Sequence, residues 1–500
     1  MKLRHLFFAS LIFSPLTVCG EESVNAPRPV PLTRPEMKRL LEDMKNRKPR
    51  IPLPEPTAEE KEKLAAEGGR IGGGYEGRLR SVYGTGFGGG GGFGGGRGGR
   101  PGEKAGDKTG DNKGEPGKTG ARGGGGFGGG QNEPGMTLTN AFKVELFWIV
   151  SRTNNCQYCM GHQESKLLNA GLKEDQIAAL DSDWSRFTPA EQVAFAFARK
   201  FTHEPNKLGD VDIDGLRKHY TDMQILEMIL SMAGNNAINR WKEGVGVPQS
   251  SSFGGFGGGR GGPAPAEKTE KTTPTVHSYL TPTPEEFTSV ITKVAPFEVD
   301  EKTGKPTTRS LYNRPKLESR EEVEKGLAAA KARKPRLPLV DEDKAREVYG
   351  EAWTDKSMPQ WARLLANFPR DGRSRAMSTK NAEESGDLKP VLKAQVSWII
   401  ARQDRAWYAT GLAKQKLVSL GVSEDDVYKL DGSWDGYSPA DRAMFTVARK
   451  LAASPVILTD ADVDEAVKQA GPKNVVQLIN YITTRAAFDR ITEAAGLQLE

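Results

Sequence analysis

The chain has 500 residues, which is too long for one ordinary domain, so we expect at least two. Apolar residues make up 36% of it, and its 58 glycines and 31 prolines are clustered, a composition that suits folded modules joined by unstructured segments. The formal net charge is only +6, from 71 basic and 65 acidic residues, so charge alone does not indicate a nucleic-acid partner.

The N-terminus has the form of a secretory signal. Lys2 and Arg4 precede a short apolar run over residues 6–13, and a small-residue site ends at Gly20. Cleavage after Gly20 and lipidation of Cys19 are both compatible with this pattern, and lipidation would anchor the protein to a membrane. We therefore expect an exported protein of the periplasm or cell envelope. No other stretch reaches the ~18 apolar residues that a membrane-spanning helix needs.

Two tracts are too rich in glycine to bury a core. They cover residues 86–130, which begin GFGGGGGFGGGRGG, and residues 250–275. Runs of glycine, phenylalanine and arginine can bind nucleic acids. Because each tract has few arginines and the chain is expected to be exported, we interpret them as disordered linkers and expect no nucleic-acid partner.

The remaining sequence contains an internal repeat. The segment that starts at Lys143 aligns without a gap with the segment that starts at Lys393, so that Trp148 meets Trp398, 250 residues later. This self-similarity predicts a duplicated module.

The upstream part of the repeat has a longer offset. KPRIPL at 48–53 matches KPRLPL at 334–339, 286 residues later, and the difference of 286 − 250 = 36 residues falls where the first glycine tract lies. The tract is therefore an insertion in the first copy. The expected organisation is a signal peptide at 1–20, an N-terminal extension of the first module at 21–85, a glycine-rich insertion at 86–133, a first domain at 137–247, a linker at 249–312 and a second domain at 313–500.

Each module is expected to be helical, which gives an all-α fold of two tandem modules. Residues 144–151 place apolar side chains at helical spacing on nearly every face, which predicts a buried helix. Residues 188–191 (TPAE) form a capping box with proline at the first helical position, and 438–441 (SPAD) repeat it. Gly171 and Gly421 are placed to end helices, because glycine readily adopts the left-handed conformation common at a helix C-terminus.

One short motif carries most of the chemistry. The stretch NNCQYCMGHQE, residues 154–164, holds two of the three cysteines, Cys156 and Cys159, one helical turn apart. The N-terminus of a helix lowers the pKa of a thiol, and His162 is spaced to accept a proton. Glu145, in the preceding apolar helix, is expected either to find a partner or to take a raised pKa, and both suit proton transfer.

Structural interpretations of the two cysteines remain open at this point. A zinc site usually needs four Cys or His ligands, and the module has one CxxC without a second pair. A purely structural disulfide that closes so short a loop stabilises little. The second copy favours chemistry, because Ala406 and Ala409 stand where the cysteines would be. Leu412 and Gln395 likewise replace His162 and Glu145.

The chain resembles the carboxymuconolactone decarboxylase and alkylhydroperoxidase D-like (AhpD-like) family. The resemblance lies in an acidic residue within a hydrophobic helix, followed by VSRTNNCQYCMGH and later by FTPAEQVAFAFARKFT. The resemblance covers 137–247 and, as a degenerate copy, 388–497. It implies an all-helical fold that assembles into homo-oligomers, with no cofactor or metal. It also implies that Cys159 attacks a peroxide, Cys156 resolves the product, and Glu145 and His162 form a proton relay, whereas the helix dipole favours Cys156 as the more acidic thiol.

The sequence thus predicts an exported thiol-dependent peroxidase of the peroxiredoxin type, an alkylhydroperoxidase with one redox-active disulfide. Its partners would be a hydroperoxide and an unidentified dithiol electron donor. Two alternatives remain: a lactone decarboxylase, the branch of the family that works without the cysteine pair, and a non-catalytic cell-envelope or assembly protein on the same scaffold.

Overall fold

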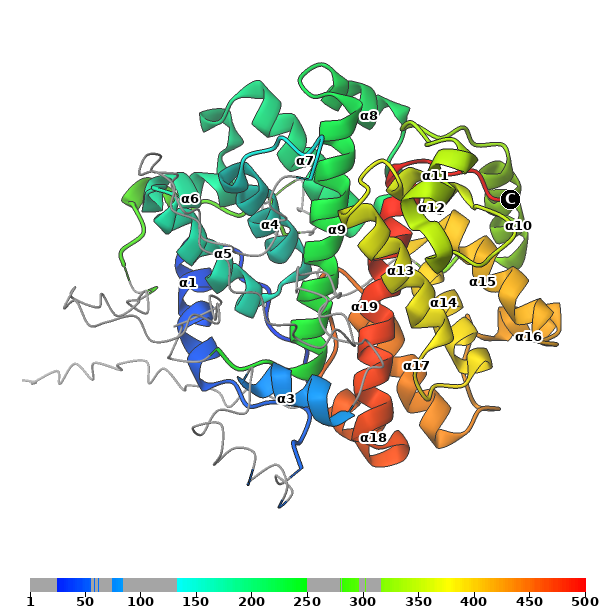
Figure 1. Cartoon of the computed structure of the whole chain (residues 1–500). Coiled ribbons are helices and arrows are strands. Elements are labelled where there is room, and N and C mark those ends of the chain that lie inside the picture. Colours follow the sequence, from blue (N-terminus) through cyan, green and yellow to red (C-terminus); the bar gives the residue numbers. More distant parts are fainter. Residues whose placement is uncertain are drawn as a thin grey trace, which may run out of the picture.

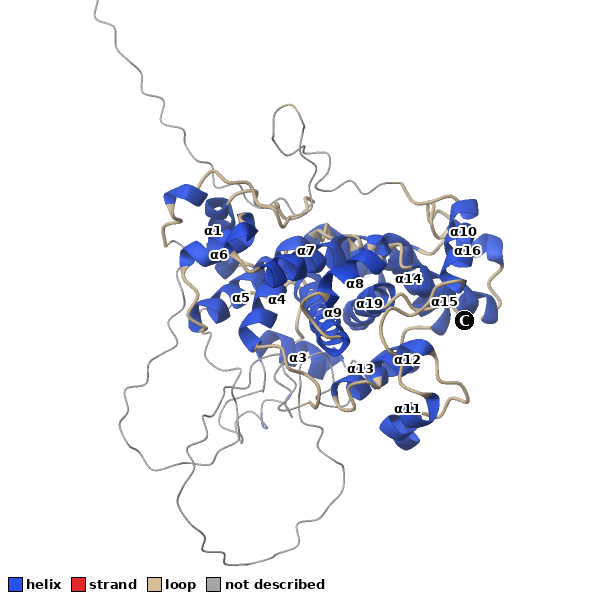
Figure 2. Cartoon of the chain, turned by 90° about the horizontal axis from the view of Figure 1, so that it is seen from above, coloured by secondary structure: helices blue, strands red, loops and turns tan. Residues whose placement is uncertain are grey.

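The computed structural model describes residues 25–54, 58, 62, 74–83, 133–249, 279, 281–295, 302 and 316–500. The proposed signal peptide, Cys19 and both glycine-rich tracts lie outside these ranges. Within them the chain is helical and has no strand (Figure 2), and one isolated bridge joins Thr33 to Ile291. The predicted all-α fold is therefore confirmed. None of the helices in these ranges is long and apolar enough to cross a membrane.

The helices of the first half surround the two-cysteine motif. They are α1 (Arg34–Asp43), α3 (Gly74–Tyr83), α4 (Asn140–Asn154), α5 (Gln157–Asn169), α6 (Glu174–Ser182), α7 (Pro189–His203), α8 (Asp210–Arg217) and α9 (Asp222–Val245). Short 3-10 turns cover Met44–Asn46, Trp184–Arg186, Pro205–Lys207 and Glu285–Phe287.

The second half contains α10 (Arg320–Lys331), α11 (Glu342–Tyr349), α12 (Gln360–Leu365), α13 (Asp371–Glu384), α14 (Pro390–Asp404), α15 (Trp407–Ser419), α16 (Glu424–Lys429), α17 (Pro439–Ala452), α18 (Asp460–Ala470) and α19 (Pro472–Ala494), with a 3-10 turn at Gly350–Ala352.

Local sequence signals set several helix ends as expected. The hydroxyl of Thr188 accepts a hydrogen bond from the backbone N–H of Glu191 at 3.3 Å, and the Glu191 carboxylate accepts one from the N–H of Thr188 at 2.8 Å, which completes the predicted capping box. Gly171 and Gly421 follow α5 and α15 with φ of +96° and +85°. A β-carbon is strained in this left-handed region, so glycine suits both positions.

The two halves repeat the same helices in the same register. The bounds of α14 and α15 lie 250 residues after those of α4 and α5. The linking residues also agree, because Asn155 and Arg405 are both left-handed, with φ of 57° and 54°. The buried ion pair from Arg152 to Asp181, at 3.1 Å, recurs 250 residues later. These correspondences support the interpretation of the sequence as a duplicated module.

The halves pack through their longest helices, α9 and α19, which lie side by side in the middle of the molecule (Figure 1). Gly244 permits the close approach, since a β-carbon there would lie 2.6 Å from Cγ2 of Ile479. Arg240 on α9 donates to the carbonyl of Ala452 at 2.9 Å, and Arg490 on α19 donates to the carbonyl of Thr202 at 3.0 Å. Because each half makes the same contact to the other, the interface has the self-complementary form of a symmetric dimer.

A second pair of exchanged contacts lies at the ends of the interface. Arg50, in the first half, forms an ion pair with Asp460, and Arg336, in the second, pairs with Asp210 at 2.8 Å. Arg50 and Arg336 are the arginines of the two KPR motifs. The arginine of each KPR motif therefore forms an ion pair with the opposite half.

We expect Arg490, a buried arginine of the second half, to be essential for stability. Arg490 donates to both oxygens of Asp404 at 2.7 and 3.0 Å, and both side chains are fully buried. Substitution Arg490→Met leaves a buried carboxylate unpaired and should lower the free energy of unfolding by about 3–5 kcal/mol, measured by urea denaturation. The control Arg320→Ala removes an exposed pair with Asp425 and should change little. Equal effects of the two substitutions would contradict this assignment.

Candidate active site around the Cys156–Cys159 disulfide

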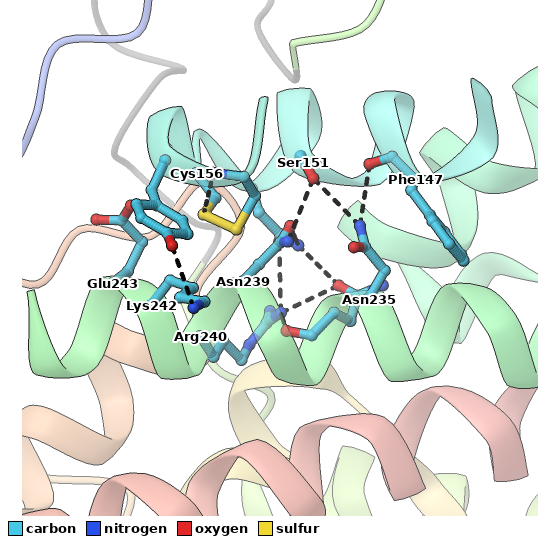
Figure 3. The surroundings of a disulfide bond; sticks show 12 residues. Phe147, Ser151, Cys156, Asn235, Asn239, Arg240, Lys242 and Glu243 are labelled. Atoms are coloured by element: carbon cyan, nitrogen blue, oxygen red, sulfur yellow. Dashed lines mark hydrogen bonds between the residues drawn. A yellow bond between two sulfur atoms is a disulfide. The ribbon is translucent and has the colours of Figure 1, made fainter. Parts of the chain in front are cut away.

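The turn between α4 and α5 places the two cysteines together. Asn155 is left-handed, and Cys156 is the residue that caps α5. Cys156 and Cys159 form a disulfide with a Cα–Cα distance of 5.3 Å, within the range that disulfides require (Figure 3). The two cysteines, three residues apart, are thus joined by a disulfide at the start of α5.

The disulfide is buried and has one favourable polar contact. Cys156 is 0% exposed and Cys159 is 3% exposed. The backbone N–H of Cys159 donates to Sγ of Cys156 at 3.3 Å. After reduction, this donor and the helix N-terminus would stabilise a thiolate on Cys156.

An aromatic and basic cluster lies beside the disulfide. The rings of Tyr158 and His162 have centroids 4.4 Å apart. Burial lowers the pKa of His162 well below its usual value, and the cations Lys242 and Lys166 lower it further. His162 is therefore a neutral imidazole near pH 7 and a weaker base than an exposed histidine.

Lys242 and Glu76 belong to the same cluster, and the sequence analysis missed both. The ammonium of Lys242 on α9 lies 3.5 Å from the Tyr158 hydroxyl and 4.5 Å from the centroid of its ring. It forms an ion pair with Glu76 on α3, which also accepts a hydrogen bond from Trp241 at 2.6 Å. Burial lowers the pKa of Lys242 despite the opposing effect of Glu76. The repeat offered a signal for Lys242, because the corresponding residue is Thr492.

Buried amides on α9 hold α4 in place beneath the disulfide (Figure 3). Asn235 donates to the carbonyl of Phe147 at 2.9 Å and to the hydroxyl of Ser151 at 3.1 Å. Asn239 donates to the same hydroxyl at 3.2 Å. These bonds satisfy polar groups that would otherwise be costly to bury, and they fix the end of α4 that leads to Cys156.

The segment before α1 covers the turn that carries the disulfide. The amides of Asn155 and Gln157 donate to the carbonyl of Pro29 at 3.1 and 3.3 Å. Arg152 donates to the carbonyl of Pro31 at 2.6 Å. A substrate that approaches from this side must displace the segment.

Glu145 lies outside this cluster. It stands nine residues before the end of α4, so about 13 Å of helix separates it from the turn. Burial raises its pKa to about 8, with a further contribution from Glu191, and the pKa of Tyr220 is raised partly by the same two carboxylates. A raised pKa was one of the outcomes expected for Glu145. Its place in a relay with the cysteines stays a prediction.

The corresponding turn of the second half has the same backbone without the sulfurs. Cys156 has φ −82° and ψ 88°, and Ala406 has φ −82° and ψ 91°. Ala406 and Ala409 are both fully buried. The turn therefore forms without a disulfide, which argues against a purely structural role for the cysteines. Among the residues that the structure describes, no group of three or more His, Cys, Asp or Glu side chains could hold a metal ion.

Comparisons with known proteins give little guidance. No family model and no curated protein matches this chain. Among solved structures, it is similar to a cysteine-to-alanine variant of the debrominase Bmp8 in complex with 2,3,4-tribromopyrrole, with 16% identity and a TM-score of 0.28 over 38% of this chain and 92% of that one. The unliganded Bmp8 debrominase gives 15% identity and a TM-score of 0.28 over 37% and 90%. Similarity this low carries no argument about activity.

The raised pKa of Glu145 has a consequence for stability. An acid whose pKa is raised in the folded state opposes folding when it ionises, so stability falls as pH rises from its unfolded pKa near 4.5 through about 8. Glu145→Gln, which copies Gln395 of the second half, removes this loss. We expect the variant to be more stable than the wild type at pH 9 by on the order of 2 kcal/mol, and equally stable at pH 4, in urea denaturation. An equal difference at both pH values would contradict this explanation.

Proposed function

We propose that this protein is an exported thiol-dependent peroxidase that reduces hydroperoxides with the Cys156–Cys159 pair. One observation carries the proposal: a disulfide closes at the N-terminus of α5, while the same turn in the second half is built with Ala406 and Ala409. Sulfurs that the fold does not need are best explained by chemistry. The resemblance to alkylhydroperoxidases points the same way, and the periplasm or cell envelope remains the proposed location.

The proposed cycle starts from the reduced pair. A thiolate attacks one peroxide oxygen, the O–O bond breaks, and the alcohol leaves after taking up a proton, which leaves a sulfenic acid. The second thiol attacks the sulfenic sulfur, forms the disulfide and releases water. An external dithiol then reduces the disulfide by thiol–disulfide exchange and is itself oxidised. Overall, one hydroperoxide and one dithiol donor yield an alcohol, water and the oxidised donor.

The residues around the disulfide suit these proton movements. His162 lies one helical turn after Cys159 and could relay a proton from a thiol to the departing alkoxide, although its lowered pKa disfavours a long-lived imidazolium. Lys242 contacts Tyr158, which stands between the two cysteines in the sequence, and the charge of Lys242 is balanced by Glu76. The scheme assigns no step to Glu145, whose role stays a prediction.

A non-catalytic envelope protein is the second candidate, and the burial of both cysteines favours it. At 0% and 3% exposure, neither sulfur is open to a peroxide in the disulfide form. The peroxidase therefore requires the turn or its covering segment at Pro29 to move when the pair is reduced. Lactone decarboxylation remains a weaker alternative, because it gives the cysteine pair no role.

Removing both sulfurs should abolish peroxide reduction without unfolding the protein. The double variant Cys156→Ala with Cys159→Ala copies the second half, so we expect a native circular dichroism spectrum and loss of hydroperoxide consumption with dithiothreitol as donor, by at least 100-fold. The matched control, Ala406→Ser with Ala409→Ser, changes the corresponding positions and should retain activity. Unchanged consumption in the cysteine variant would refute the peroxidase and favour the envelope protein.

The two thiols should differ in acidity. The N–H of Cys159 donates to Sγ of Cys156, so Cys156 should have the lower pKa. In the single variants Cys159→Ser and Cys156→Ser, the pH dependence of alkylation by iodoacetamide reports the remaining thiol. We expect the midpoint for Cys156 to lie below the ordinary value near 8.5 and below that for Cys159. The reverse order would support Cys159 as the attacking sulfur, as the family resemblance implies.

A further inference from the structure

Some contacts across the interface of the two halves are not reciprocal, and two of them reach the residue just before the disulfide turn. The arginine contacts described above occur twice, once from each half, and they explain how the halves assemble. By contrast, Ser454, just after α17 of the second half, donates its hydroxyl proton to Oδ1 of Asn154 at 2.6 Å. The backbone N–H of Val456 donates to the carbonyl of Asn154 at 3.1 Å. The second half thus holds the last residue of α4, two residues before Cys156.

Asn154 is fully engaged by both halves. Its amide donates to the side-chain oxygens of Asn236 and Asn239 at 2.8 and 3.1 Å, and Arg240 donates to its Oδ1 at 3.4 Å. Ser454 also accepts a hydrogen bond from Arg240 at 2.9 Å. The hydroxyl therefore lies between the interface arginine and the residue that precedes the disulfide turn.

The corresponding contact in the opposite direction does not exist in the described part of the chain. Asp404 occupies the position of Asn154, and its carboxylate is bound by Arg490 of its own half. Glu204 occupies the position of Ser454 and pairs with Lys207 instead. Packing alone would give both turns the same support. The extra contact goes to the turn that carries the cysteines.

We propose that Ser454 is a positioning residue through which the second half holds the Cys156–Cys159 couple in its oxidised geometry. The inference rests on the proposed redox role of the pair. Reduction lengthens the contact between the sulfurs from a covalent bond to van der Waals separation, so the turn must relax. Bonds that anchor Asn154 oppose this relaxation and favour the disulfide.

The proposal can be tested without any substitution by hydrogen exchange of the intact chain. The N–H of Val456 is bonded to Asn154 across the interface, whereas the neighbouring N–H of Ile457 is bonded at 3.2 Å to Lys450 in its own half. On reduction with dithiothreitol, we expect the exchange of the Val456 amide to accelerate at least fivefold and that of Ile457 to stay within twofold. Equal responses of the two amides, or none, would overturn the proposal.

A substitution gives a second measurement. Ser454→Ala removes the hydroxyl and should make the disulfide about tenfold easier to reduce, a shift of roughly 30 mV for a two-electron couple, in glutathione redox buffers at fixed pH. The control Thr459→Ala removes another hydroxyl of the second half, the cap of α18, whose bonds stay within that helix end. It should lower stability and leave the potential unchanged. An unchanged potential in Ser454→Ala, or an equal shift in both variants, would overturn the proposal.

These measurements distinguish the inference from the proposed function. The potential and the exchange rates report on the thiol couple whether or not it consumes peroxide. A wild type that does not reduce hydroperoxides, but whose potential shifts with Ser454→Ala, would refute the peroxidase and leave the positioning role standing. If the wild type reduces hydroperoxides but Ser454→Ala leaves the potential unchanged, the proposed peroxidase stands and the positioning role is refuted.

Discussion

The arrangement of this molecule depends on two buried arginines, Arg240 and Arg490, at the contact of α9 and α19. A guanidinium without exposure to water needs acceptors for its donors, and these arginines take carbonyls from the last turn of a helix in the opposite half. Carbonyls at helix C-termini lack partners within their own helix. Each half therefore supplies donors to helix-end carbonyls that the other half leaves open.

On this shared scaffold, only the first half carries the cysteine pair of the proposed redox site. The turn before α5 and its counterpart before α15 agree within a few degrees, although one holds a disulfide and the other two alanines. What differs lies around the sulfurs: His162 and Lys242 face the motif where the second half has Leu412 and Thr492. The backbone is set by helix ends and packing, so these side chains were free to differ.

The sequence predicts the local features well, because they depend on neighbouring residues. The capping box at Thr188, the left-handed Gly171 and the cysteine spacing all follow from short-range rules. Glu76 and Ser454 could not be placed from the sequence, since tertiary packing brings them to the motif from distant segments. Glu145 lies on the expected helix, and its place in a proton relay with the cysteines stays a prediction.

Fusion of the two copies has a consequence that a homodimer would lack. In a symmetric dimer of identical chains, the residue at the position of Ser454 would be the same in both subunits, as would the residue at the position of Asn154. Here Ser454 faces Asn154, while Glu204 and Asp404 occupy the matching positions and each pairs within its own half. Because the two copies share one chain, the second half can lack the cysteines and still bind Asn154 of the first half through Ser454. The reciprocal arginines hold the two halves together, and the contact of Ser454 with Asn154, which has no counterpart, reaches only the turn that carries the cysteines.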